Sequence, residues 1–89
     1  MTQGANAIGC EIYRDALRRL LRRARLAAGL KQADVAVRLG VPQSFVSKYE
    51  SGQRKLDVIE LREVCAVLGT GLPALLGALD AEAAGGRTE

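Results

Sequence analysis

Apolar residues recur along most of this 89-residue chain at steps of three and four, the spacing typical of helices that bury one side. A glycine follows each of the first four apolar stretches, and glycine commonly ends a helix in the left-handed conformation. The pattern predicts five helices, over residues 11–28, 32–39, 43–51 and 58–68 and from about residue 72 onward. Strand-forming runs of Val, Ile and Thr are missing, so the predicted fold class is all-α.

The fourth predicted helix carries the clearest local signals. Asp57 precedes it and Glu60 follows three residues later, which is the spacing of a capping box. We expect this helix to bury one stripe of side chains, which consists of Val58, Leu61, Val64, Cys65 and Leu68.

The length and the two ends of the chain indicate its domain organisation. The chain fits one domain, because two domains would each approach the ~40 residues below which metals or disulfides are usually needed. Residues 1–9 and 81–89 contain many small residues and glycines, so we expect both segments to be flexible. Residues 10–80 then form the folded domain.

Composition excludes several classes of function. The chain has no histidine, which rules out a histidine metal site, a Ser-His-Asp triad and a Cys-His dyad. We therefore expect no enzyme activity, no metal and no cofactor. Two cysteines are too few for a disulfide framework, and no apolar run reaches 18 residues. The first residues lack a basic start followed by an apolar stretch, so we expect no leader peptide. These features favour a cytoplasmic protein.

Charge is distributed unevenly along the chain. Residues 13–55 contain eleven Lys and Arg against three acidic residues, whereas residues 56–89 contain two against six. The net charge of +3 therefore combines a strongly basic segment, residues 13–55, with an acidic segment, residues 56–89. Such an asymmetry indicates a polyanionic partner on one side of the molecule.

Residues 32–51 contain the spacing that two short helices need when they meet at a large angle. Ala36 is small enough for close approach, Gly40 permits a tight left-handed turn, and β-branched Val46 fills the gap between the helices. This pattern predicts a helix-turn-helix whose second helix protrudes. Such a helix fits the ~12 Å wide major groove of B-DNA.

The segment LRRARLAAGLKQADVAVRLGVPQSFVSKYESGQRKLDVIELREVCAVLG, residues 21–69, resembles the phage repressor and Cro-like (XRE-type) DNA-binding family. The resemblance extends over about residues 17–80 and is closest in VSKYESGQRKLDVIELREV. It implies a five-helix, lambda-repressor-like domain with an extended first helix. It also implies a homodimeric transcriptional regulator, here expected to be a repressor, that binds a palindromic operator in double-stranded DNA.

The same resemblance implies which residues contact DNA, with 43–51 as the recognition helix. The expected base contacts are Gln43, Ser44, Ser47 and Lys48. Gln43 can pair with adenine and Lys48 with guanine. Lys31 stands where the family usually has a capping Ser or Thr, and we interpret it as a phosphate contact. The full set of expected backbone contacts is Arg22, Lys31, Gln32, Ser51, Arg54 and Lys55.

Other residues have expected structural or alternative roles. Arg25 and Glu50 match a buried ion pair between the first and third helices. Phe45 could contact a thymine methyl, cover the second helix or join a dimer contact. The arginines Arg14, Arg18 and Arg19 could contact flanking DNA or the acidic half of a partner subunit.

The fifth helix is the expected dimer interface, because its leucines exceed what one short terminal helix can bury. The leucines concerned are Leu72, Leu75, Leu76 and Leu79. They could instead cap the core of a single chain. An alternative function is an antitoxin- or antiactivator-type adaptor that binds a protein partner through its first and fifth helices. Membrane-surface binding is disfavoured, because the Arg-rich helix has no interfacial Trp or Phe.

Overall fold

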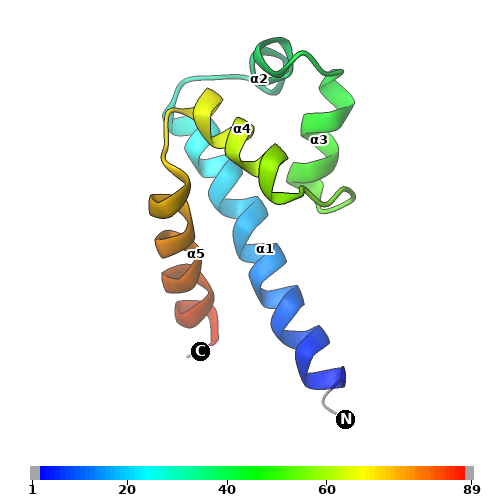
Figure 1. The fold of residues 1–89 in the computed structure, drawn as a ribbon, viewed down its shortest axis with the longest axis vertical. Coiled ribbons are helices and arrows are strands. Elements are labelled where there is room, and N and C mark those ends of the chain that lie inside the picture. The colour runs from blue at the N-terminus through cyan, green and yellow to red at the C-terminus, as the bar shows by residue number, and fades with distance from the viewer. Residues whose placement is uncertain (1–2, 88–89) are drawn as a thin grey trace.

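The computed structural model describes residues 3–87, which form five α-helices joined by short loops (Figure 1). The fold class is therefore all-α, as predicted. The helices are α1 (Gln3–Ala27), α2 (Gln32–Leu39), α3 (Gln43–Ser51), α4 (Val58–Leu68) and α5 (Leu72–Arg87).

The long helix α1 organises the arrangement of the others. In Figure 1, α4 crosses in front of α1, and α5 runs back alongside α1 in the opposite direction. The α2–α3 unit and α5 lie on different sides of α1. Helix α3 and the C-terminal helix α5 therefore occupy separate surfaces of the molecule.

The core lies where α1, α2, α3 and α4 meet. Leu21, Val35, Val46, Val64 and Cys65 are almost completely buried, and together they represent each of these four helices. Burying such side chains contributes about 1.5–3 kcal/mol each relative to exposure. The helical periodicity of the sequence therefore correctly predicts the positions at the centre of the fold.

Both terminal helices are longer than predicted. α1 begins at Gln3 rather than near residue 11, and α5 continues to Arg87 through the segment expected to be flexible. Ala83 near the end of α5 is 1% exposed, and the neighbouring Glu82 forms an ion pair with Arg19 of α1. Contact with α1 thus supports the end of α5 despite its glycines, which on their own disfavour a helix.

One prediction about a buried position is wrong. Val58 is 63% exposed, because it is the first residue of α4 and the buried stripe begins only at Leu61. Of the leucines expected at a dimer interface, Leu75 is 5% exposed and packs in the core of its own chain, as in the alternative of a single-chain cap. Leu72 is also partly buried against that core, which leaves Leu76, 47% exposed, as the most accessible of the four leucines.

The predicted capping box at the start of α4 is confirmed. The Glu60 backbone N–H donates to Oδ1 of Asp57 at 2.7 Å, and the Asp57 N–H donates to Oε1 of Glu60 at 3.0 Å. Each bond satisfies a backbone donor that the helix itself leaves without a partner.

None of the helices within residues 3–87 is both long and apolar enough to cross a membrane as one segment. Joined together, α4 and α5 reach that length and composition, but they are bent by 101° at the break between them.

Candidate nucleic-acid interface

The α2 and α3 helices meet in the predicted helix-turn-helix. Gly40 adopts a φ of 72°, and the Val41 N–H donates to the Ala36 carbonyl at 3.0 Å, so the chain reverses within three residues. Ala36 is 3% exposed and Val46 is fully buried at the contact between the helices. Ala36, Gly40 and Val46 therefore occupy the positions in the helix-turn-helix that the sequence pattern predicts.

The two sides of α3 differ sharply. Val46, Tyr49 and Glu50 are buried on the inner side. Gln43, Ser44 and Lys48 are exposed on the outer side, and Ser47 is half-buried, with its hydroxyl donating to the Ser44 carbonyl at 3.2 Å. The residues predicted to contact bases thus lie on one side of the helix.

The charge on this outer side is positive. The Lys48 ammonium forms no ion pair among the residues that the structure describes, and the four outer residues include no carboxylate. Amide, hydroxyl and ammonium groups are the donors that pair with base edges in the major groove. The outer side of α3 is therefore chemically suited to contact DNA bases.

A buried ion pair anchors the inner side of α3 to α1. Arg25 donates from Nε to Oε2 of Glu50 at 2.7 Å and from a terminal nitrogen to Oε1 at 3.0 Å, and both side chains are buried. The hydrogen bonds to Glu50 raise the pKa of Arg25 above its usual value. The structure thus brings together the two residues expected to pair.

Gln32 also bonds to the buried Arg25–Glu50 pair. The sequence predicts only a DNA backbone contact for this residue. Its amide nitrogen donates to Oε1 of Glu50 at 3.0 Å, and the side chain is half-buried. Glu50 therefore links α1, α2 and α3. The sequence carries no local signal for this contact, because 18 positions separate Gln32 from Glu50.

Lys31 lies exposed immediately before α2. Its backbone N–H donates to the Asp34 carboxylate at 2.8 Å, and its side chain makes no capping hydrogen bond. The missing side-chain cap agrees with the expectation from the sequence. The ammonium group is left beside the amino end of a helix, where the helix dipole favours a phosphate.

The loop after α3 contains Arg54, which already has an intramolecular partner. Its guanidinium group contacts the Glu60 carboxylate at 3.1 and 3.2 Å and lies 4.1 Å from the centre of the Phe45 ring. The bond to Glu60 raises the pKa of Arg54 and lowers that of Glu60. The sequence predicts a phosphate contact at Arg54 but does not predict this pairing.

Phe45 packs inward instead of projecting from the recognition helix. Its ring is partly buried against the core and meets Tyr49 edge-to-face, with 5.9 Å between ring centres. Phe45 could have contacted a thymine methyl, covered the second helix or joined a dimer contact. Its packing against the core agrees with the second of these possibilities.

The remaining expected backbone contacts lie at the surface. Ser51 is exposed at the end of α3, and its hydroxyl donates to the Lys48 carbonyl at 3.1 Å. Arg22 and Lys55 are exposed, and neither forms an ion pair within the described part of the chain.

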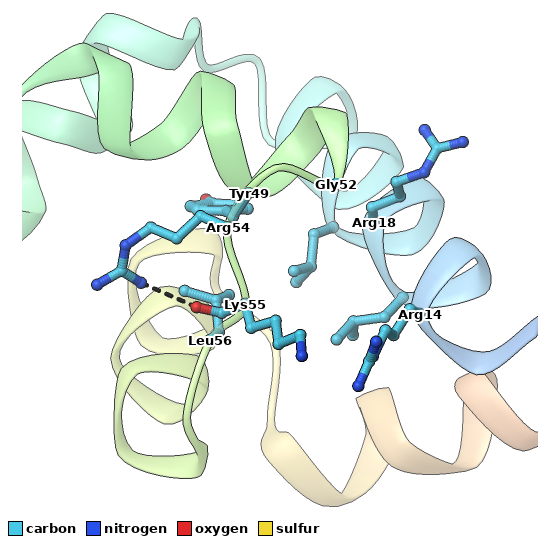
Figure 2. Close-up of a pocket in the computed structure, with 9 residues that line it drawn as sticks. Arg14, Arg18, Tyr49, Gly52, Arg54, Lys55 and Leu56 are labelled. Atoms are coloured by element: carbon cyan, nitrogen blue, oxygen red, sulfur yellow. Dashed lines mark hydrogen bonds between the residues drawn. The ribbon is translucent and has the colours of Figure 1, made fainter. Parts of the chain in front are cut away.

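The structure also brings together cations that are far apart in the sequence. Arg14 and Arg18 of α1 line a cleft of about 260 Å³ together with Lys55 of the loop after α3 (Figure 2). Arg19, for which a partner subunit was one expected contact, instead contacts Glu82 of its own chain at 3.3 Å. No group of three or more metal-binding side chains occurs within the described residues.

A five-helix domain in which a tight turn joins two short helices, the second with an outer side free of carboxylates, defines the class of helix-turn-helix DNA-binding proteins. Comparison with known proteins agrees with this assignment. Residues 21–75 match the model of the Helix-turn-helix family. A solved structure described as an XRE-family like protein from Pseudomonas syringae pv. tomato str. DC3000 is 49% identical, with a TM-score of 0.79.

That similarity covers 88% of this chain and 94% of the solved chain. A search of curated protein sequences finds no match. The chain belongs to the XRE-type helix-turn-helix family of DNA-binding transcription regulators.

Proposed function

We propose that α3 lies in the major groove of an operator, where Gln43, Ser44, Ser47 and Lys48 contact base edges. The observation that carries this proposal is the contrast between the two sides of α3. The inner side is fixed to the core by Val46 and by the pair of Glu50 with Arg25, whereas the outer side presents donors without a carboxylate. A rigid helix with free donors on one side can discriminate between bases.

Phosphate contacts on either side of α3 position the helix in the groove. The exposed side chains of Arg22, Lys31, Ser51 and Lys55 supply four of these contacts. Gln32 acts through the backbone N–H groups at the start of α2, because its amide nitrogen is engaged by Glu50. Arg54 contributes through the part of its guanidinium group that Glu60 leaves exposed.

We further propose that the protein acts as a homodimer on a palindromic operator in the cytoplasm and represses transcription there. One domain carries one recognition helix, so a two-fold pair places two such helices ~34 Å apart, one turn of DNA. The leucines of α5 that remain accessible can form the contact between subunits. They are Leu76, which is 47% exposed, and the partly buried Leu72 and Leu79.

The experiment that tests this function is selection of bound sites from random duplex DNA by the full-length protein. We expect a short half-site that recurs in inverted orientation with centres one helical turn apart. Enrichment of single half-sites would contradict the dimer but not DNA reading by α3. Failure to enrich any sequence would contradict the proposed function itself.

A protein-binding adaptor is the second candidate, and the exposure of Leu76 on α5 favours it. Its surface would lie away from α3 (Figure 1), so one chain could bind both DNA and a protein. Leu76→Asp should weaken any protein contact at α5, the proposed homodimer included, while an isolated domain still contacts a half-site.

A further inference from the structure

The cleft between α1 and the loop after α3 is lined by four cations, of which Arg18 and Arg54 pair with carboxylates and Arg14 and Lys55 form no ion pair among the described residues. Leu17, Leu21 and Leu56 line it together with Arg14 and Lys55. Figure 2 shows the Lys55 ammonium and the Arg14 guanidinium group extending toward one another on the same side of the cleft. The two cations come from segments about forty positions apart, so only the fold creates this arrangement.

Neither of these two cations has an acidic partner in the part of the chain that is described. Asp15 follows Arg14 directly, but its carboxylate pairs with Arg18 and Arg19. The side chains that line the cleft include no Asp or Glu. Two cations held together without a carboxylate create a positive potential that attracts an anion.

The cleft also lies directly beside the end of the recognition helix. Gly52 ends α3 with a φ of 87° and lines the cleft. A Cβ atom on Gly52 would lie 3.6 Å from Cδ of Arg18, so α1 packs closely against this turn. The cleft is therefore adjacent to the carboxyl end of α3.

We propose that Arg14 and Lys55 bind one phosphate group between them in this cleft, and that the DNA backbone supplies it. This inference rests on the proposed function. A phosphate has several acceptor oxygens and can accept hydrogen bonds from an arginine and a lysine at the same time. The DNA footprint then extends beyond the helix-turn-helix along α1, and Arg14 becomes a positioning contact that discriminates little between bases.

The test compares the DNA affinity of Arg14→Gln with that of the wild type, on the selected operator and on random DNA. We expect a loss of about fivefold on both DNAs, and a plot of log K against log salt that is shallower by about 0.9 per lost phosphate contact. Arg14→Lys should retain most of the affinity, because it keeps the charge. Circular dichroism and the thermal midpoint confirm that each variant folds.

Arg62→Gln is the matched control, since Arg62 is exposed on α4, forms no ion pair among the described residues and does not line the cleft. Equal behaviour of the Arg14 and Arg62 variants on DNA overturns the inference. A wild type that binds no DNA overturns the proposed function instead, which separates the two failures.

A second measurement distinguishes DNA from free phosphate as the source of the bound group. Inorganic phosphate is compared with chloride at the same ionic strength, and the thermal midpoint of the free protein is recorded. A midpoint raised by phosphate in the wild type but not in Arg14→Gln shows that the cleft binds phosphate. The same result together with unchanged DNA affinity in Arg14→Gln overturns the DNA backbone as the source.

Discussion

Two arginines reach the recognition helix from different sides, and each is paired with a glutamate in a different environment. In the Arg25–Glu50 pair the side chains are only 9% and 4% exposed, and the shortest N–O distance is 2.7 Å. In the Arg54–Glu60 pair the corresponding fractions are 36% and 33%, and the distance is 3.1 Å. The first pair joins two helices inside the core, whereas the second holds a surface loop that solvent can reach.

The unpaired cations complete this comparison. Lys31, Lys48 and Lys55 are all exposed and take part in no ion pair within the described residues. A charge that is neutralised inside the protein contributes less to binding a polyanion than one that is free. Around α3, we therefore expect the cations without an acidic partner to contribute most to the proposed binding of DNA.

The largest expected effect is on stability, from removing one member of the buried pair. Glu50→Ala leaves Arg25 buried without its carboxylate and removes the acceptor for Gln32. We expect a loss of about 3–5 kcal/mol in the free energy of unfolding, measured by urea denaturation.

The double variant Arg25→Met with Glu50→Leu serves as the control. It removes both charges and should recover most of that loss. A Glu50→Ala protein as stable as one carrying a substitution at exposed Glu63 would show that the buried pair contributes no more to stability than a surface carboxylate.

Tyr49 tests how completely the core beside the Arg25–Glu50 pair excludes solvent. Its hydroxyl is buried without a hydrogen-bond partner among the described residues, and burial raises its pKa from 10.0 to about 12. Because the folded state holds this proton more tightly than the unfolded state, stability falls as pH rises from 10 toward 12. The loss should reach about 2 kcal/mol at pH 12.

Tyr49→Phe should abolish that alkaline loss. At neutral pH it should raise the free energy of unfolding by about 1 kcal/mol, because it removes an unsatisfied buried polar group. Thermal unfolding followed across pH measures both effects. An alkaline decline of equal size in Tyr49→Phe would assign the decline to other groups.

Lys48 tests the function of an unpaired cation. Lys48→Ala should cost about 1–3 kcal/mol in affinity for the operator and little in affinity for random DNA, because a base contact is lost. Stability should change little, since the side chain is exposed. Titrations by fluorescence anisotropy on both DNAs give the two affinities. An equal loss on both would make Lys48 a phosphate contact.

The smallest expected effect concerns the exposed pair. Glu60→Gln removes the charge that neutralises Arg54, and the guanidinium group then becomes a stronger phosphate ligand. We expect DNA affinity to rise about twofold, with a steeper dependence on salt. Glu63→Gln, an equal change of charge on the same helix, is the control. A matching rise in both variants would indicate only a change in net charge.

Much of the helical framework follows from local patterns in the chain. The spacing of Ala36, Gly40 and Val46 predicts the helix-turn-helix, and Asp57 with Glu60 predicts the start of α4. These signals depend on contacts within a few residues, where backbone geometry alone determines which side chains meet. Val58 was misplaced because a first-turn residue has no preceding turn to show which side is buried.

The pairing of charged side chains could not be predicted in the same way. Long arginine and lysine side chains reach several carboxylates at similar energy, so position in the chain does not select a partner. The contacts of Arg19 with Glu82, Gln32 with Glu50 and Arg54 with Glu60 became evident only from coordinates. The burial of Leu75 likewise depends on where α5 packs against the core, which the sequence does not show.

The sequence by itself was thus enough to specify the three central helices, the turn and the outward-facing donors of α3, since each depends on short-range sterics and apolar periodicity. The packing of α1 against α5 and against the loop after α3 decided which leucines are covered and which cations are neutralised. It also placed Arg14 beside Lys55. Such long-range proximity results from the sum of many weak contacts across the core, which no short segment encodes.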